Sequence, residues 1–150
     1  MVAVYNAIVG TANHKLDAEA LFRRFAERHG LRFEPRASVH MEVWWTFPVQ
    51  PGLSTPITLG LQNLDELNFG VDEFWSSFFP FDRVPAEFER VIDAWVDGRA
   101  RVAVTGRHTG RLQLREGGRW TTVYSAEGCL SLFRRRPKGF LINQSGPPKA

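Results

Sequence analysis

The sequence predicts an α+β fold, built mainly from an antiparallel sheet with two principal helices. Two stretches, at about 16–29 and 85–97, carry apolar residues at helical spacing. Several others alternate apolar and polar residues, as half-buried strands do. Only a few residues separate the candidate strands of the last third, and such short turns join antiparallel neighbours because a parallel pair needs a long crossover. We expect six to seven strands in a single domain over residues 1–150, with a short flexible tail at about 145–150.

Both predicted helices have end signals that agree with their apolar stripes. In the first, Phe22 and Phe25 belong to the stripe and Gly30 can take the left-handed conformation that ends a helix. In the second, Pro85 suits the first helical position and Gly98 suits the stop. Stripes of this kind are typical of helix faces buried in a core.

Strands are expected wherever the alternation persists between turn residues. The expected strands are 39–46, 57–62, 67–71, 101–105, 111–115, 119–125 and 140–143. Trp44 and Trp45 are adjacent in the first of these, so their side chains point to opposite faces of the sheet. One tryptophan must lie off the buried face. We expect a second layer, a helix or the aromatic segment described next, to cover it rather than a cleft to expose it.

An aromatic segment at 74–81 places five aromatic residues within eight positions. It is interpreted first as a turn that plugs the core ahead of the second helix. The alternative is an exposed patch that docks a partner or mediates a homodimer.

Composition narrows the class of protein. The 150 residues include 43% hydrophobic and 23% charged residues, which is typical of a globular chain. We expect no membrane span and no signal peptide, because the apolar runs are short and the first ten residues lack a basic region. The single cysteine, Cys129, fits a reducing compartment, so we expect a cytoplasmic protein, and an inert thiol among apolar neighbours.

Charge is distributed unevenly along the chain. Residues 1–98 carry 8 basic against 14 acidic side chains, a net of −6, whereas residues 99–150 carry 11 against 2, a net of +9. Four arginines of the predicted C-terminal sheet are expected on one solvent-facing positive surface, where guanidinium groups can hold phosphate or carboxylate. They are Arg101, Arg111, Arg115 and Arg119. The same charges are also typical of an ordinary solvated sheet face.

Nucleic acid is a less favoured partner, because the overall excess is only three positive charges and no known nucleic-acid motif is present. Trp120 and Tyr124, expected on one strand face with Thr122, are the candidates for base stacking.

Candidate catalytic residues are few. His40 and Glu42 are expected on one face of the first long strand, close enough to share a proton, with Trp44 as a stacking floor. Gly10 to Asn13 offers a weak candidate for a helix cap that cradles an anion. The histidine spacings match no metal motif, and neither a metal nor a cofactor is expected.

The sequence is therefore interpreted as a small cytoplasmic, non-enzymatic protein that binds a protein partner or a small anionic ligand. An alternative is a small cleft-type enzyme that uses His40 and Glu42 as acid–base groups. A second alternative is a single-strand nucleic-acid binder that uses the basic C-terminal sheet.

Overall fold

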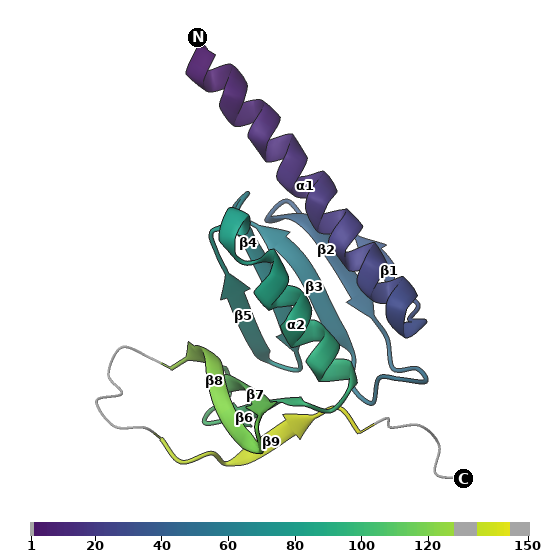
Figure 1. Cartoon of the computed structure of the whole chain (residues 1–150), viewed down its shortest axis with the longest axis vertical. Coiled ribbons are helices and arrows are strands. Elements are labelled where there is room, and N and C mark those ends of the chain that lie inside the picture. The colour runs from purple at the N-terminus through teal and green to yellow at the C-terminus, as the bar shows by residue number, and fades with distance from the viewer. Residues whose placement is uncertain (1, 128–134, 145–150) are drawn as a thin grey trace.

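The computed structural model describes the backbone of residues 2–127 and 135–144, and the side chains from His14 onward within these ranges. The expected tail at 145–150 and Cys129 lie outside the described residues. In chain order the elements are α1 (Val2–His29), β1 (Glu34–Arg36), β2 (Met41–Phe47), β3 (Ile57–Gln62), β4 (Glu66–Val71), β5 (Phe74–Phe78), the 3-10 turn η1 (Phe81–Arg83), α2 (Pro85–Val96), β6 (Ala100–Val104), β7 (Gly110–Glu116), β8 (Arg119–Ala126) and β9 (Gly139–Ile142) (Figure 1).

The first five strands form one antiparallel sheet in the order β1-β2-β3-β4-β5, so each strand pairs with its neighbour in sequence. Alternation decides which side chains face the helices. Val43, Trp45 and Phe47 of β2 are buried, and Trp44 and Thr46 point to the opposite face. Both helices lie over the face that buries Trp45 (Figure 1).

The helix α2 confirms the prediction for 85–97, with Pro85 in its first turn. The helix α1 corrects the prediction for 16–29, because it begins at Val2 and its first part extends beyond the sheet (Figure 1). Gly10 to Asn13 therefore lies inside α1 and caps no helix, which removes the proposed anion cradle. A glycine or an asparagine inside a helix costs roughly 1 kcal/mol or less relative to alanine, so neither residue by itself ends a helix. No helix in the described part of the chain has the length and apolarity needed to cross a membrane.

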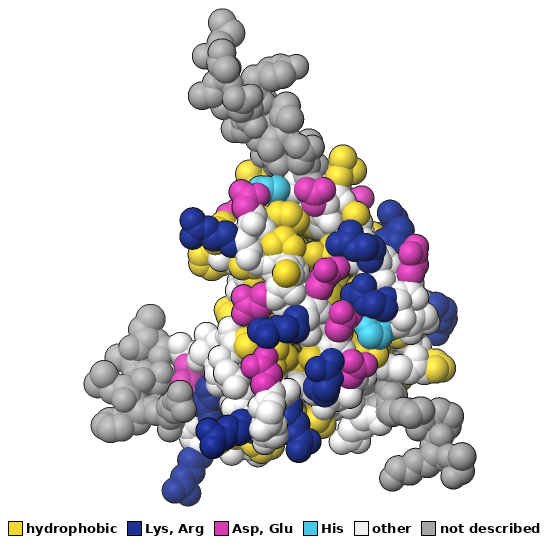
Figure 2. Space-filling model, viewed as in Figure 1, with side chains coloured by type: hydrophobic (Ala, Val, Ile, Leu, Met, Phe, Trp, Pro, Cys, Tyr) yellow, Lys and Arg dark blue, Asp and Glu magenta, His cyan; other side chains and the backbone are white. Residues whose placement is uncertain are grey.

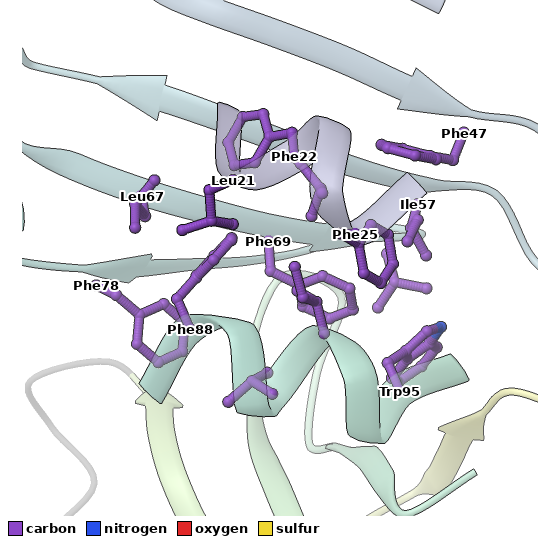
Figure 3. Close-up of a cluster of buried hydrophobic side chains, with 14 of the residues drawn as sticks. Leu21, Phe22, Phe25, Phe47, Ile57, Leu67, Phe69, Phe78, Phe88 and Trp95 are labelled. Carbon is purple, nitrogen blue, oxygen red and sulfur yellow. The ribbon is translucent and has the colours of Figure 1, made fainter. Parts of the chain in front are cut away.

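The core lies between the helices and the five-stranded sheet. Phe22 and Phe25 from α1 meet Phe88 and Trp95 from α2 above buried side chains of the strands (Figure 3). Phe22 contacts the rings of Trp45 and Phe88, at centroid distances of 5.7 and 6.1 Å. At the surface the two helices are joined by ion pairs. These are Arg24 with Glu89 and Arg28 with Asp93, and the ring Nε2 of His29 also lies 2.7 Å from Oδ1 of Asp93.

The last four strands form a second antiparallel sheet in the order β8-β7-β6-β9. The α+β class is confirmed, but the expectation of one sheet with six to seven strands is wrong. The second sheet lies at one end of the first, where β8 packs against β5 and β6 packs against α2 (Figure 1). Alternation identifies a strand but does not say which other strand it pairs with, and so could not separate the two sheets.

The aromatic segment at 74–81 is mostly core. It forms strand β5 and the turn η1 rather than a simple turn, and it buries Phe74, Phe78 and Phe81. Trp75 is half-buried, and Phe79 is 62% exposed. Only Phe79 keeps the high exposure that the docking interpretation requires.

Trp44 differs from the expectation of a covering layer. It lies half-buried on the sheet face that points away from both helices, and β5 belongs to the same sheet, so the aromatic segment forms no second layer over it. Within the described residues, the aromatic segment that was expected to cover Trp44 instead forms β5, an edge strand of the same sheet.

Candidate anion-binding face

Several arginine side chains lie on one face of the four-stranded sheet. The register pairs Arg101 with Gln113 and Ala103 with Arg111 across β6 and β7, and pairs Arg115 with Trp120 across β7 and β8. Directly paired residues share a face, so Arg101, Arg111 and Arg115 lie on one side of the sheet, as the alternation predicts. We call this side the Arg101 face. It includes Arg101, Ala103, Arg111, Gln113, Arg115, Trp120, Thr122 and Phe140.

Charge over the helices differs from charge over this sheet. Basic and acidic side chains alternate over α1 and α2, whereas basic ones predominate at the end of the molecule where the four-stranded sheet lies (Figure 2). The uneven charge along the sequence therefore becomes an uneven charge in space.

A β-bulge corrects the prediction that Trp120 and Tyr124 share a face. The register between β7 and β8 shifts at Leu112 and Gln113, so that Tyr124 pairs with Leu112 while Trp120 pairs with Arg115. Tyr124 consequently turns to the core, where it contacts Phe74 and Phe78 at centroid distances of 6.2 and 6.0 Å. An extra residue in one strand reverses the alternation beyond it.

Arg101 lies between two aromatic rings at the centre of its face. Its guanidinium carbon is 4.2 Å from the ring centroid of Trp120 on β8 and 4.1 Å from that of Phe140 on β9. Its Nε donates a 2.9 Å hydrogen bond to Oε1 of Gln113 on β7. All four strands thus contribute to holding one side chain, and cation–π attraction and a hydrogen bond fix the plane of the guanidinium.

The far edge of this guanidinium is free to bind. In the described part of the chain, the two terminal nitrogens of Arg101 have no acceptor and no carboxylate partner. Desolvation by partial burial lowers the pKa of Arg101 from its usual value, yet arginine keeps its charge in proteins. A fixed, charged fork whose two terminal nitrogens both carry open N–H groups matches two oxygens of a carboxylate or phosphate.

Arg111 does not offer a free charge. Its Nη1 donates to Oε1 of Glu127 at 2.5 Å and to the backbone carbonyl of Arg135 at 3.2 Å. Both side chains of the pair are nearly buried, with 11% and 12% exposed. Arg111 therefore anchors the segment after residue 134 against the sheet.

Arg115 and Arg119 are both exposed, but they lie on opposite faces of the β7–β8 hairpin. Arg115 pairs with Trp120 on the Arg101 face, whereas Arg119 pairs with Glu116, whose side chain holds Arg90 of α2. The expectation of one surface formed by all four arginines therefore fails at Arg119. Adjacent residues in a strand alternate faces, and Arg119 directly precedes Trp120.

The structure does not join His40 and Glu42. His40 is exposed and precedes β2, and its backbone N–H is bonded to Oγ of Ser38. Glu42 sits at a β-bulge between Met41 and Val43, and its Oε1 accepts a 3.3 Å hydrogen bond from the backbone of Leu64. No hydrogen bond links the two among the described side chains, because the bulge breaks the regular alternation on which their shared face depended.

A hollow on the outer side of the five-stranded sheet is the other candidate site. It has a volume of about 290 Å³ and includes Thr58, Gly70, Asp72 and Trp75. The ring of Trp75 lies across Gly70, where an added Cβ would be 2.6 Å from it. The hollow offers a carboxylate and hydroxyl groups but no cation, so it does not suit an anion.

Phe140 and Gln113 are the site residues that sequence reasoning missed. Residues 140–143 were expected as a strand, and their alternation already set Phe140 and Ile142 apart from Leu141. Alternation could not predict which residues lie beside Phe140. In the structure, β9 pairs with β6 in antiparallel register, which places Phe140 opposite Ala103 and beside Arg101.

The described residues contain no group of three or more histidine, cysteine, aspartate or glutamate side chains placed to hold a metal ion. Comparisons of the chain with protein-family models, with curated proteins and with solved structures return no match.

Proposed function

We propose that this protein is a non-enzymatic binding protein whose ligand is anionic and binds on the Arg101 face. One observation carries the proposal. The Arg101 guanidinium is held by Trp120, Phe140 and Gln113 while its terminal nitrogens face no acceptor in the described chain. Holding a side chain in its binding conformation removes much of the entropy that a flexible surface arginine loses when it captures a ligand.

The proposal also accounts for the contrast between Arg101 and the arginines that form ion pairs. Arg24, Arg28, Arg90 and Arg111 each have a carboxylate partner. Arg101 instead has aromatic neighbours, which position its charge without neutralising it. A guanidinium needed only for solubility would have no reason to be fixed by residues from three other strands.

The enzyme alternative has weaker support. Acid–base chemistry at His40 and Glu42 would need the two groups to face one substrate, and Glu42 is instead engaged by the turn at Leu64. This geometry favours the binding function over the enzyme function.

Retention on a heparin column tests the proposal, because heparin presents repeated anionic groups but no aromatic bases. We expect the parent protein to bind, and Arg101→Ala to elute at clearly lower salt. Arg101→Lys should resemble Arg101→Ala more than the parent, because lysine keeps the charge but lacks the planar fork. Arg119→Ala is the matched control, since it removes the same charge from the opposite face. Equal elution of Arg101→Ala and Arg119→Ala would rule out Arg101 as the centre of the site.

A further inference from the structure

We infer that the anionic ligand of the Arg101 face is a single-stranded nucleic acid. This inference rests on the proposed function and names the class of its ligand. Three features of the face support it: the aromatic rings, the row of unpaired cations, and the width of the sheet.

The aromatic rings distinguish this face from a simple anion site. Phe140 is 51% exposed although it belongs to a regular strand, and Trp120 is half-buried. Each ring gives one side to the Arg101 guanidinium. Among the described aromatic residues, no contact joins the rings of Trp120 and Phe140 to each other. This is expected when the two rings lie on opposite sides of the guanidinium plane. Their outer sides are then directed away from Arg101, and nucleic-acid bases stack on aromatic surfaces of this kind.

The cations of this part of the molecule are mostly without partners. The acids Glu116 and Glu127 are already paired, with Arg90 and Arg111. The described basic residues that follow residue 99 and have no carboxylate partner are Arg101, Arg115, Arg119, Arg135, Arg136 and Lys138. All but Arg119 lie on the Arg101 face or in the segment 135–138, which the Arg111 hydrogen bond holds against one end of β7.

The spacing of these charges suits a polymer. Arg115 lies near one end of β7 and Arg111, with the attached segment 135–138, lies near the other. The four intervening steps of strand span roughly 14 Å. A single phosphate or carboxylate engages one fork, whereas a chain with a charge on every unit can engage Arg101 and the charges on both sides of it.

A double helix fits this face poorly. Four strands at about 4.8 Å spacing make a surface roughly 14 Å wide before side chains are counted, which exceeds the major-groove width of about 12 Å. The bases of a duplex are also stacked inside it and cannot reach Trp120 or Phe140. Single strands leave their bases free to stack on protein side chains.

The test is fluorescence anisotropy with the full chain and a labelled oligothymidylate of about 12 nucleotides, at low salt. Polyglutamate, inorganic phosphate and a blunt duplex of the same length serve as competitors. We expect the single strand to bind most tightly. Phe140→Ala should weaken its binding about tenfold or more, because it removes one stacking surface, and should weaken polyglutamate binding clearly less, because polyglutamate loses only the support that Phe140 gives to Arg101. Phe140→Leu keeps an apolar cover over Arg101 and gives the same readout if the alanine variant does not fold.

Salt dependence adds a second measurement. Arg115→Ala should reduce the slope of log K against log salt by about 0.7, the amount expected for one lost phosphate contact of a single strand. Arg119→Ala, on the other face of the same hairpin, should leave the slope unchanged.

The two proposals fail in different ways. If the oligonucleotide binds no more tightly than polyglutamate or the duplex, or if Phe140→Ala weakens all ligands equally, the nucleic-acid inference is overturned and anion binding stands. If heparin, polyglutamate and the oligonucleotide all fail to bind the parent protein, the proposed function itself is wrong.

Discussion

The guanidinium carbon of Arg101 lies 4.2 Å from the ring centroid of Trp120, although β6 and β8, the strands that carry them, are not neighbours in their sheet. The contact crosses β7, and on the other side Phe140 of β9 approaches the same guanidinium at 4.1 Å. One long side chain therefore ties together the two edge strands of the sheet.

Arg101→Ala should for this reason destabilise the fold as well as impair binding. We expect a loss of about 1–2 kcal/mol in the free energy of unfolding, because two cation–π contacts are removed from a half-buried position. Urea melts of the parent and of Arg119→Ala provide the comparison, and Arg119→Ala should stay within about 0.5 kcal/mol of the parent. If the two variants unfold at the same urea concentration, Arg101 contributes nothing to the stability of the sheet.

Trp95→Ala should be among the most damaging single substitutions. Trp95 is 1% exposed and contacts the ring of Phe69 at a centroid distance of 5.3 Å. Truncation of a buried tryptophan costs ~3–5 kcal/mol. Trp95→Phe should cost far less, because the buried indole nitrogen has no hydrogen-bond partner in the described structure and its removal leaves no group unsatisfied. Denaturant melts decide this, and a phenylalanine variant as unstable as the alanine variant would contradict it.

Gly70→Ala should destabilise the five-stranded sheet through a clash with Trp75. An added Cβ would lie 2.6 and 2.8 Å from two carbon atoms of the indole ring. Overpacking of this kind costs about 1–3 kcal/mol. The loss of stability caused by Gly70→Ala should be smaller in a protein that also carries Trp75→Ala. A double-mutant cycle measures this coupling between the two positions. Gly139→Ala is the control, since an added Cβ there meets nothing within 4 Å. Strict additivity of the two changes at 70 and 75 would argue against the clash.

Asn143→Ala should loosen the attachment of β9 to the rest of the molecule. The Nδ2 of Asn143 donates to the carbonyl oxygens of Gly52 and Val96 at 2.8 and 3.0 Å, and its Oδ1 accepts from the backbone of Ser54 at 2.9 Å. Asn143 is buried, so truncation leaves several backbone groups without partners, at a cost of about 3 kcal/mol. Thermal melts should show a clear drop, with exposed Gln144→Ala as the neutral comparison. A drop of equal size in both variants would mean that the hydrogen bonds of Asn143 are not its cause.

Local patterns were enough to predict most of the elements. The stripe that includes Phe88 and Trp95 identified α2 almost to the residue, and alternation located the described strands other than β1 and β5, because each of these elements buries one face and the period of burial appears directly in the sequence. The shared face of Arg101, Arg111 and Arg115 was predictable for the same reason.

Pairing between distant segments decided the rest. The division into two sheets, the bulge that sends Tyr124 to the core and Trp120 to the Arg101 face, and the bulge that separates His40 from Glu42 all depend on which strands meet and where one strand gains a residue. The extension of α1 to Val2 was missed because Gly10 to Asn13 was interpreted as a possible helix cap rather than as helix interior. Arg101 was already visible in the sequence as one arginine among many. Only the tertiary structure placed Trp120, Gln113 and Phe140 around it, because those contacts join residues 12 to 39 positions away and no local periodicity encodes such a distance.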